Sequence, residues 1–174
     1  MDQKEKTAGQ RLQEELGFEF KHIAKTHPDD VEAALAFCED YKVFMDHSKT
    51  ERECTAYLEQ MAKKEGYSLF DPAGKYRAVD KAYFINRLKN VFLVTFGRKS
   101  LEEGVRFNIA HIDSPRLDLK PFPLYEQDEL AYFKTHYYGG IRKYQWGTIP
   151  LAMHGVVMLK DGTSVSISVG EKDE

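Results

Sequence analysis

The chain has little cysteine, no long apolar run and no excess of positive charge. Its two thiols, Cys38 and Cys54, lack the paired spacing of a zinc finger, so we expect no disulfide framework and two reduced, half-buried side chains. No apolar run approaches the roughly 20 residues of a membrane helix, which argues against a membrane partner. Residues 1–6 also lack the apolar core of a signal peptide. We therefore expect a cytoplasmic protein.

The balance of charge argues against a nucleic-acid partner. The chain carries 25 Lys and Arg against 28 Asp and Glu, a formal net charge of −3, and these residues are dispersed along it. Binding to phosphates usually needs a basic face. The 174 residues do include 42% hydrophobic side chains, which is enough for a buried core in one ordinary domain or two small ones.

Hydrophobic periodicity predicts helices in the first half. From Pro28, apolar residues recur at a spacing that lines one helix face, and they are Val31, Ala34, Leu35, Cys38, Tyr41 and Met45. Before Pro28, a short docked helix and a partly disordered arm are both compatible with the sequence.

A second helix has two alternative entry signals. Ser48 with Glu51 and Thr50 with Glu53 both have the spacing of a capping box, and only one can be used. Gly66 supplies the left-handed residue at the helix end. We expect a buried stripe made of Cys54, Tyr57, Leu58 and Met61.

Later segments are typical of strands. Residues 82–86 and 91–96 predict two strands joined by a short turn, and residues 105–110 predict a third. Helices followed by nearly continuous apolar strands indicate an α/β class with helices on a mixed sheet. Beyond Pro115 the pattern changes to shorter strands with Pro121 and Pro123, and then to a hairpin of residues 151–160 and 163–169. We predict one domain over residues 1–115 and a β-rich one over residues 116–174.

The most informative stretch lies where the third predicted strand ends. If that strand continues, period-two alternation places His111 and Asp113 on the same side of it. An imidazole nitrogen can bind a divalent metal while a nearby carboxylate fixes the imidazole tautomer. A strand-terminal His bonded to Asp113 or to the backbone, with no metal, is the alternative. Spacing alone favours that alternative, because zinc needs about three protein ligands.

Several motifs in one order resemble the N-terminal portion of the bacterial branch of the aspartyl aminopeptidase family of two-zinc metallopeptidases. They are HIDSP at residues 111–115, LKP at 119–121 and YGGI at 138–141, together with residues 41–53 and 143–151. The resemblance covers the chain from about Pro28 onward. It implies a partial zinc-aminopeptidase catalytic domain followed by part of a β-rich oligomerisation domain, and hence a homo-oligomer.

The resemblance also implies an activity and site roles. Family members remove N-terminal residues, acidic ones in the best-known cases, from peptides at a site with two zinc ions. By resemblance, His111 is a zinc ligand and Asp113 is the catalytic carboxylate that orients the site. The family's remaining ligands and its Glu-Glu pair lie downstream of the second domain, beyond Glu174. We therefore expect an incomplete site and a chain that is inactive alone.

Residues that could replace the missing groups have simpler explanations. Glu102 and Glu103 precede His111 in a turn, which favours a solvated loop over the family's Glu-Glu pair. His136 and His154 lie in strand-like settings, which favour polar or satisfied histidines over replacement ligands.

Residues 136–146 combine aromatic rings with cations, as base-stacking platforms do. The net charge of −3 instead favours a glycine turn whose aromatics pack internally or at a subunit contact. The first hypothesis for the protein is thus a zinc aminopeptidase portion. The alternative is a non-catalytic homologue that acts as an oligomerisation or peptide-binding module, and a nucleic-acid binder is a third and poorer one.

Overall fold

The computed structural model describes residues 6–18 and 20–171. The chain divides into two compact units, Met1–Val43 and Phe44–Glu174, with the division inside a helix. The first unit holds α1 (Ala8–Leu16), α2 (Ile23–Thr26) and most of α3 (Pro28–Asp46). None of the described residues of these helices is buried. The helix predicted from Pro28 is confirmed as α3, and its apolar face is exposed.

The helix α4, Glu51–Lys64, begins at one of the two predicted capping boxes. The Glu53 backbone N–H donates to Thr50 Oγ1 at 3.3 Å, and the Thr50 N–H donates to the Glu53 carboxylate at 2.9 Å. Each side chain therefore satisfies a backbone donor that a helix N-terminus leaves free. Beyond the helix end, Gly66 takes the expected left-handed conformation, with φ +80°.

The buried face of α4 differs in part from the predicted stripe. Cys54 is buried as expected, but Met61 is 45% exposed, and Thr55 and Ala62 are buried in its place. The face of α4 that covers the sheet is thus rotated by about one residue from the one that apolar spacing alone selects. Periodicity gives the existence of a face, whereas the packing partner decides its centre.

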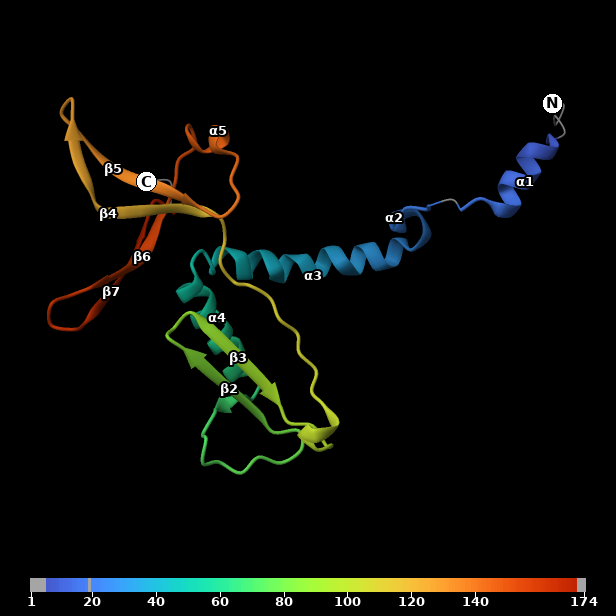
Figure 1. The fold of residues 1–174 in the computed structure, drawn as a ribbon, viewed down its shortest axis with the longest axis horizontal. Helices are drawn as coiled ribbons and strands as arrows, with labels where there is room; N and C mark the ends of the chain where they lie inside the picture. Colours follow the sequence, from blue (N-terminus) through green and yellow to red (C-terminus); the bar gives the residue numbers. More distant parts are fainter. Residues whose placement is uncertain (1–5, 19, 172–174) are drawn as a thin grey trace. The chain divides into compact units, whose positions relative to one another are not determined.

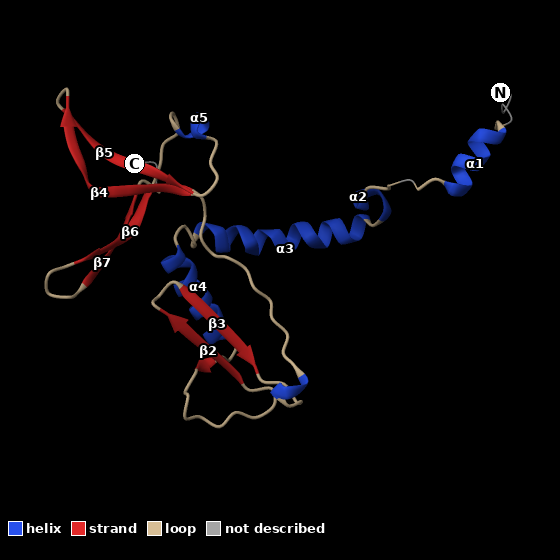
Figure 2. Ribbon diagram, viewed as in Figure 1, coloured by secondary structure: helices blue, strands red, loops and turns tan. Residues whose placement is uncertain are grey.

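A three-stranded mixed sheet packs against α4 (Figures 1 and 2). The strand β1 (Ser68–Leu69) is parallel to β2 (Lys81–Asn86), which is antiparallel to β3 (Asn90–Thr95). Ala82 and Tyr83 of β2 are buried, and the Tyr83 hydroxyl donates to Glu59 of α4 at 3.1 Å. The two predicted strands and the α/β class are confirmed.

The third predicted strand, at residues 105–110, is wrong. After the short 3₁₀ helix η1 (Leu101–Glu103), residues 104–115 form no strand, and Phe107 and Ile109 are 77% and 88% exposed. Figure 1 shows this segment as an extended connection that leads to β4. Its apolar, β-branched sequence suits a strand, but in the described part of the chain no neighbouring strand offers the hydrogen bonds of a ladder.

Two hairpins make up the remaining sheet structure. The strands β4 (Arg116–Gln127) and β5 (Leu130–Tyr138) pair antiparallel, with a register shift between Leu119 and Leu124. This irregularity accommodates the two prolines, so one long bulged strand replaces the shorter strands predicted there. After α5 (Lys143–Trp146), the strands β6 (Met153–Met158) and β7 (Ser164–Val169) form the predicted second hairpin. The domain boundary near Pro115 stays a prediction.

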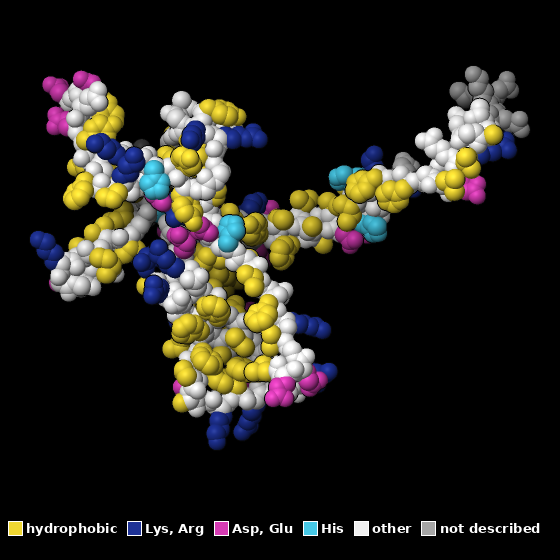
Figure 3. All heavy atoms as spheres, in the orientation of Figure 1, with side chains coloured by type: hydrophobic (Ala, Val, Ile, Leu, Met, Phe, Trp, Pro, Cys, Tyr) yellow, Lys and Arg dark blue, Asp and Glu magenta, His cyan; other side chains and the backbone are white. Residues whose placement is uncertain are grey.

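Apolar side chains remain exposed on the β2–β3 hairpin (Figure 3). The strand β3 is an edge of its sheet among the described residues, and Phe92, Leu93 and Val94 are 55%, 47% and 42% exposed. Within the same described ranges, no helix is long and apolar enough to cross a membrane.

Candidate metal centre

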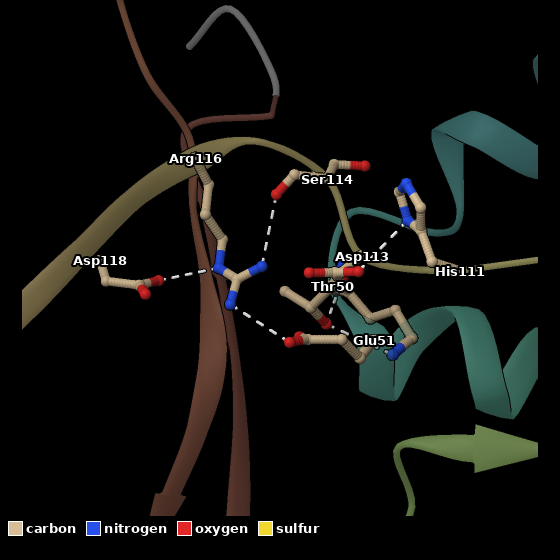
Figure 4. A network of polar contacts seen from close by, with 8 residues as sticks. Thr50, Glu51, His111, Asp113, Ser114, Arg116 and Asp118 are labelled. Carbon is tan, nitrogen blue, oxygen red and sulfur yellow. Dashed lines mark hydrogen bonds and ion pairs between the residues drawn. The ribbon is translucent and has the colours of Figure 1, made fainter. Parts of the chain in front are cut away.

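His111 and Asp113 lie in the connection that precedes β4, and their side chains meet. The His111 Nδ1 atom is 3.2 Å from Asp113 Oδ1, and the two side chains are 83% and 27% exposed. Figure 4 shows the imidazole directed toward the carboxylate. The strand from which this juxtaposition was predicted does not form, but the spacing of two residues still allows the contact in an extended backbone.

This geometry selects the imidazole atom that faces solvent. A carboxylate at Nδ1 favours the tautomer whose proton is on Nδ1, which leaves the lone pair of Nε2 available. Neutral imidazole nitrogen is a ligand that zinc prefers. The pair therefore fits one zinc ligand and its supporting carboxylate. Among residues 6–18 and 20–171, however, no group of three or more His, Cys, Asp or Glu side chains could hold a metal ion.

Asp113 is kept ionised by its surroundings. The Tyr138 hydroxyl donates a hydrogen bond to the carboxylate and lowers the pKa of Asp113, while partial desolvation opposes this shift. A backbone hydrogen bond at Asp113 and the charge of Arg116 lower it further. The same hydrogen bond raises the pKa of Tyr138. An ionised phenolate could no longer donate to Asp113 and would lie beside another negative charge.

Arg116 is a functional candidate that sequence reasoning missed. Its guanidinium contacts Asp118 at 2.8 Å, Glu51 at 3.2 Å and the Ser114 carbonyl at 3.3 Å (Figure 4). It also lies 4.1 Å from the centroid of the Tyr138 ring. The sequence gives no signal for this cluster beyond the position of Arg116 directly after the HIDSP motif, because Glu51 lies 65 residues away along the chain.

The acidic pair Glu102 and Glu103 lies outside this cluster. Both residues are exposed in η1, and Glu103 is 3.3 Å from Lys99 in a surface ion pair. The prediction of a solvated turn is confirmed.

His136 and His154 have separate partners of their own. His136 is exposed, with Nδ1 at 3.0 Å from the Tyr137 carbonyl oxygen. The His154 side chain is only 12% exposed and lies between Glu53 at 2.8 Å and Glu171 at 2.6 Å. Burial lowers the pKa of His154, but the hydrogen bonds to Glu53 and Glu171 outweigh it, so the pKa is raised. The prediction that each is a polar surface or a satisfied, half-buried histidine is confirmed, and the structure decides which is which.

In the aromatic segment, cations of the same chain cover two rings. Lys143 lies 4.1 Å from the Tyr137 centroid, and Arg116 covers Tyr138. Gly139 has φ +75°, and a Cβ there would meet Pro115 at 3.4 Å, so glycine allows the turn after β5 to approach the HIDSP motif. The predicted glycine turn is confirmed, but Tyr137, Tyr138 and Tyr144 are 51%, 41% and 75% exposed, so internal packing of these rings is not seen and a subunit contact stays a prediction.

Both cysteines are free thiols in different settings. Cys38 is exposed on α3, whereas Cys54 is buried on α4, where burial raises the pKa of its thiol. The expectation of two half-buried thiols is therefore wrong for each of them, in opposite directions.

The chain is similar to known aminopeptidases. The family model described as "Aminopeptidase I zinc metalloprotease (M18)" matches residues 44–173. A probable M18 family aminopeptidase 1 of Clostridium acetobutylicum is 45% identical over 160 residues, which cover 89% of this chain and 34% of that protein. This chain thus spans about a third of the length of that curated relative.

Solved structures agree with this similarity. The crystal structure of aminopeptidase I from Borrelia burgdorferi B31 matches with a TM-score of 0.78 and 42% identity, over 84% of this chain and 37% of that one. The M18 family aminopeptidase of Thermotoga maritima matches with a TM-score of 0.78 and 39% identity, over 89% of this chain and 34% of that one.

Proposed function

The chain belongs to the M18 family of zinc metalloproteases, and from this premise we propose that it supplies part of an aminopeptidase that removes N-terminal residues from peptides. His111 is the proposed zinc ligand, and Asp113 is its supporting carboxylate. The observation that carries this proposal is the 3.2 Å contact between His111 Nδ1 and Asp113 Oδ1, in which the imidazole remains open to solvent.

Each residue of the pair has a defined task in this proposal. His111 presents Nε2 as the metal donor, and Asp113 holds the ring and its Nδ1 proton. Tyr138 in turn donates to Asp113 and keeps that carboxylate ionised. Zinc, when bound, activates water and polarises a carbonyl group, and we propose two ions in the complete site. Peptides with an acidic N-terminal residue are the first substrates to test.

The remaining ligands would come from outside the described residues. Two observations support this part of the proposal: the described part of the chain contains no group of three candidate ligands, and the chain spans only about a third of its curated relative. A single imidazole with one supporting carboxylate is too small a set for a zinc site. We therefore expect the isolated chain to hydrolyse no peptide.

We further propose that the protein is a cytoplasmic homo-oligomer. The exposed edge strand β3, with Phe92, Leu93 and Val94 on it, supports association, because an unpaired apolar edge is a template for another chain. The dispersed charge supports the location. Sedimentation of the isolated chain tests the association, and a stable monomer would contradict it.

A chimera tests the proposed function directly. This chain would replace the matching N-terminal third of the Clostridium acetobutylicum relative, and release of N-terminal Asp from a short peptide would be followed. We expect hydrolysis that a chelator abolishes and added zinc restores. The relative itself, rejoined at the same junction, is the control. A folded chimera that binds no zinc, or an isolated chain that shows zinc-dependent hydrolysis, would contradict the proposal.

A further inference from the structure

The segment that carries His111 and Asp113 has few ties to the rest of the protein. Within the described ranges, no hydrogen bond from backbone to backbone involves residues 105–113. The side chains of Phe107 and Ile109 are exposed, so packing does not hold the segment either. A metal ligand must nevertheless be kept in a defined orientation, because misplacement by about 1 Å is enough to impair a site. Its support must come from the C-terminal end of the segment.

At that end, Asp113 accepts a hydrogen bond from the Tyr138 hydroxyl, and Arg116 makes the other polar contacts. Three guanidinium nitrogens have three different partners: Nη1 donates to the Ser114 carbonyl, Nη2 to Glu51 and Nε to Asp118. Ser114 directly follows Asp113, Glu51 opens α4, and Asp118 lies on β4. Arg116 therefore joins the ligand segment to a helix N-terminus and to a hairpin.

The planar face of the same guanidinium makes a further contact, with an aromatic ring. Arg116 lies over the ring of Tyr138, its cross-strand partner on β5, at 4.1 Å from the centroid. The Arg116 side chain is 26% exposed and the Glu51 side chain 21%, so both are largely withdrawn from water. Partly buried, charge-assisted contacts of this kind are stronger and less screened than surface ion pairs.

We propose that Arg116 is a positioning residue, which holds the His111–Asp113 pair in the orientation needed for metal binding by tying Ser114 to Glu51, Asp118 and the Tyr138 ring. The inference rests on the proposed function of His111 as a zinc ligand. Only arginine suits this position, because a planar fork can donate in three directions while its face lies on a ring. A lysine would keep the charge but would have one nitrogen for three acceptors.

The test reads the imidazole itself and needs no metal. In the ¹⁵N-histidine-labelled chain at pH 8.5, where an ordinary imidazole is neutral, the nitrogen shifts report which ring atom is protonated. His111→Asn assigns the signal by difference, and solid-state spectra serve if the chain is associated. We expect the Nδ1–H form to dominate for His111. Arg116→Met should shift it toward the Nε2–H form that free imidazole prefers, and Arg116→Lys should fall between the two.

Two controls separate positioning from general destabilisation. Arg106 lies in the same segment, is exposed and takes part in no ion pair of the described residues, so Arg106→Met should leave the His111 spectrum unchanged. His154→Ala should lower the stability of the same unit at another place, and it should also leave the His111 spectrum unchanged. Should Arg116→Met fail to fold, Glu51→Gln weakens only the tie to α4, because it removes the charge of the acceptor, and should give a smaller shift in the same direction.

The outcomes decide the proposal independently of catalysis. An unchanged His111 spectrum in folded Arg116→Met, or in Glu51→Gln if the former does not fold, would overturn the positioning role. In the chimera, Arg116→Met should weaken zinc binding by about 10- to 100-fold, as loss of groups that orient a ligand typically does, whereas Arg106→Met should not. If no version of the chimera binds zinc, the proposed function fails, and the spectra still decide whether Arg116 orients the pair.

Discussion

Two histidines of the same unit meet carboxylates in opposite settings. His111 has one carboxylate partner and an open ring, with 83% of its side chain exposed. His154 has a carboxylate at each ring nitrogen and only 12% of its side chain exposed. The first keeps a nitrogen free for a ligand, whereas the second has none left. The difference shows that the number of partners and the exposure of the ring, more than the presence of a carboxylate, separate a candidate ligand from a structural histidine.

Replacement of His111 should have the largest effect on activity. In the active chimera, we expect His111→Ala to lower kcat/KM by about 1,000-fold or more, because a catalytic metal contributes several kcal/mol of transition-state stabilisation. Peptide hydrolysis measures this loss, and thermal unfolding should change little because the ring is exposed. Retained turnover in a folded variant would show that His111 is not a ligand.

Replacement of His154 should have the opposite signature. We expect His154→Ala to lower the free energy of unfolding by about 1–2 kcal/mol, since Glu53 and Glu171 lose their hydrogen-bond donor. Urea denaturation measures the change, and the activity of the folded chimera should stay near that of the parent. His136→Ala is the matched control, with an effect within about 0.5 kcal/mol, because that ring is exposed. If His154→Ala lost activity but kept its stability, His154 would be a functional residue and not a structural histidine.

The two carboxylates around His154 should contribute unequally. Glu53→Gln should cost about 1 kcal/mol, because the one glutamine oxygen still closes the capping box of α4 while the amide group left beside His154 has neither the charge nor the second acceptor oxygen. Glu171→Gln should cost a few tenths of a kcal/mol, because its side chain is 42% exposed and solvent screens the pair. Urea denaturation of both variants at pH 6 measures the order. Equal losses of unfolding free energy in the two variants would contradict the expectation that the less exposed Glu53 contributes more to the contact with His154 than Glu171 does.

The pH dependence of stability should give the smallest effect. Because the pKa of His154 is raised in the folded protein, its contribution is fully present below the unfolded value of about 6.5 and is lost as the pH rises through the folded value. The difference in unfolding free energy between the parent and His154→Ala should therefore shrink from pH 6 toward pH 9. Subtracting the unfolding free energy of the variant from that of the parent cancels the contributions of the other titrating groups. If this difference in unfolding free energy grew with pH, it would contradict a protonated His154 bound between Glu53 and Glu171.

Much of the secondary structure could be predicted because its causes are local. The helix from Pro28 and the capping box at Thr50 and Glu53 depend on residues a few positions apart. The pairing of residues 82–86 with residues 91–96 depends on a short turn. Residues 105–110 have an equally suitable composition but form no strand. A strand needs a partner, and composition does not say whether one is present.

The candidate site divides in the same way. His111 and Asp113 could be identified from the sequence, because they are two residues apart and belong to a recognisable motif. Arg116 could not, since its role depends on Glu51 and Tyr138, which approach it only when α4, β4 and β5 come together.

The sequence by itself determined the helix from Pro28, the capping box at Thr50 and Glu53, the hairpin of residues 82–96 and the later one of residues 151–169, the family, and the two residues proposed to serve a metal. Only the tertiary structure decided which histidine is open and which is saturated, which face of α4 is buried, and which guanidinium supports the His111–Asp113 pair. Local propensities and motifs act over a few covalent neighbours. Burial and charge networks depend on distances between segments that are remote in the chain, and those distances exist only after folding.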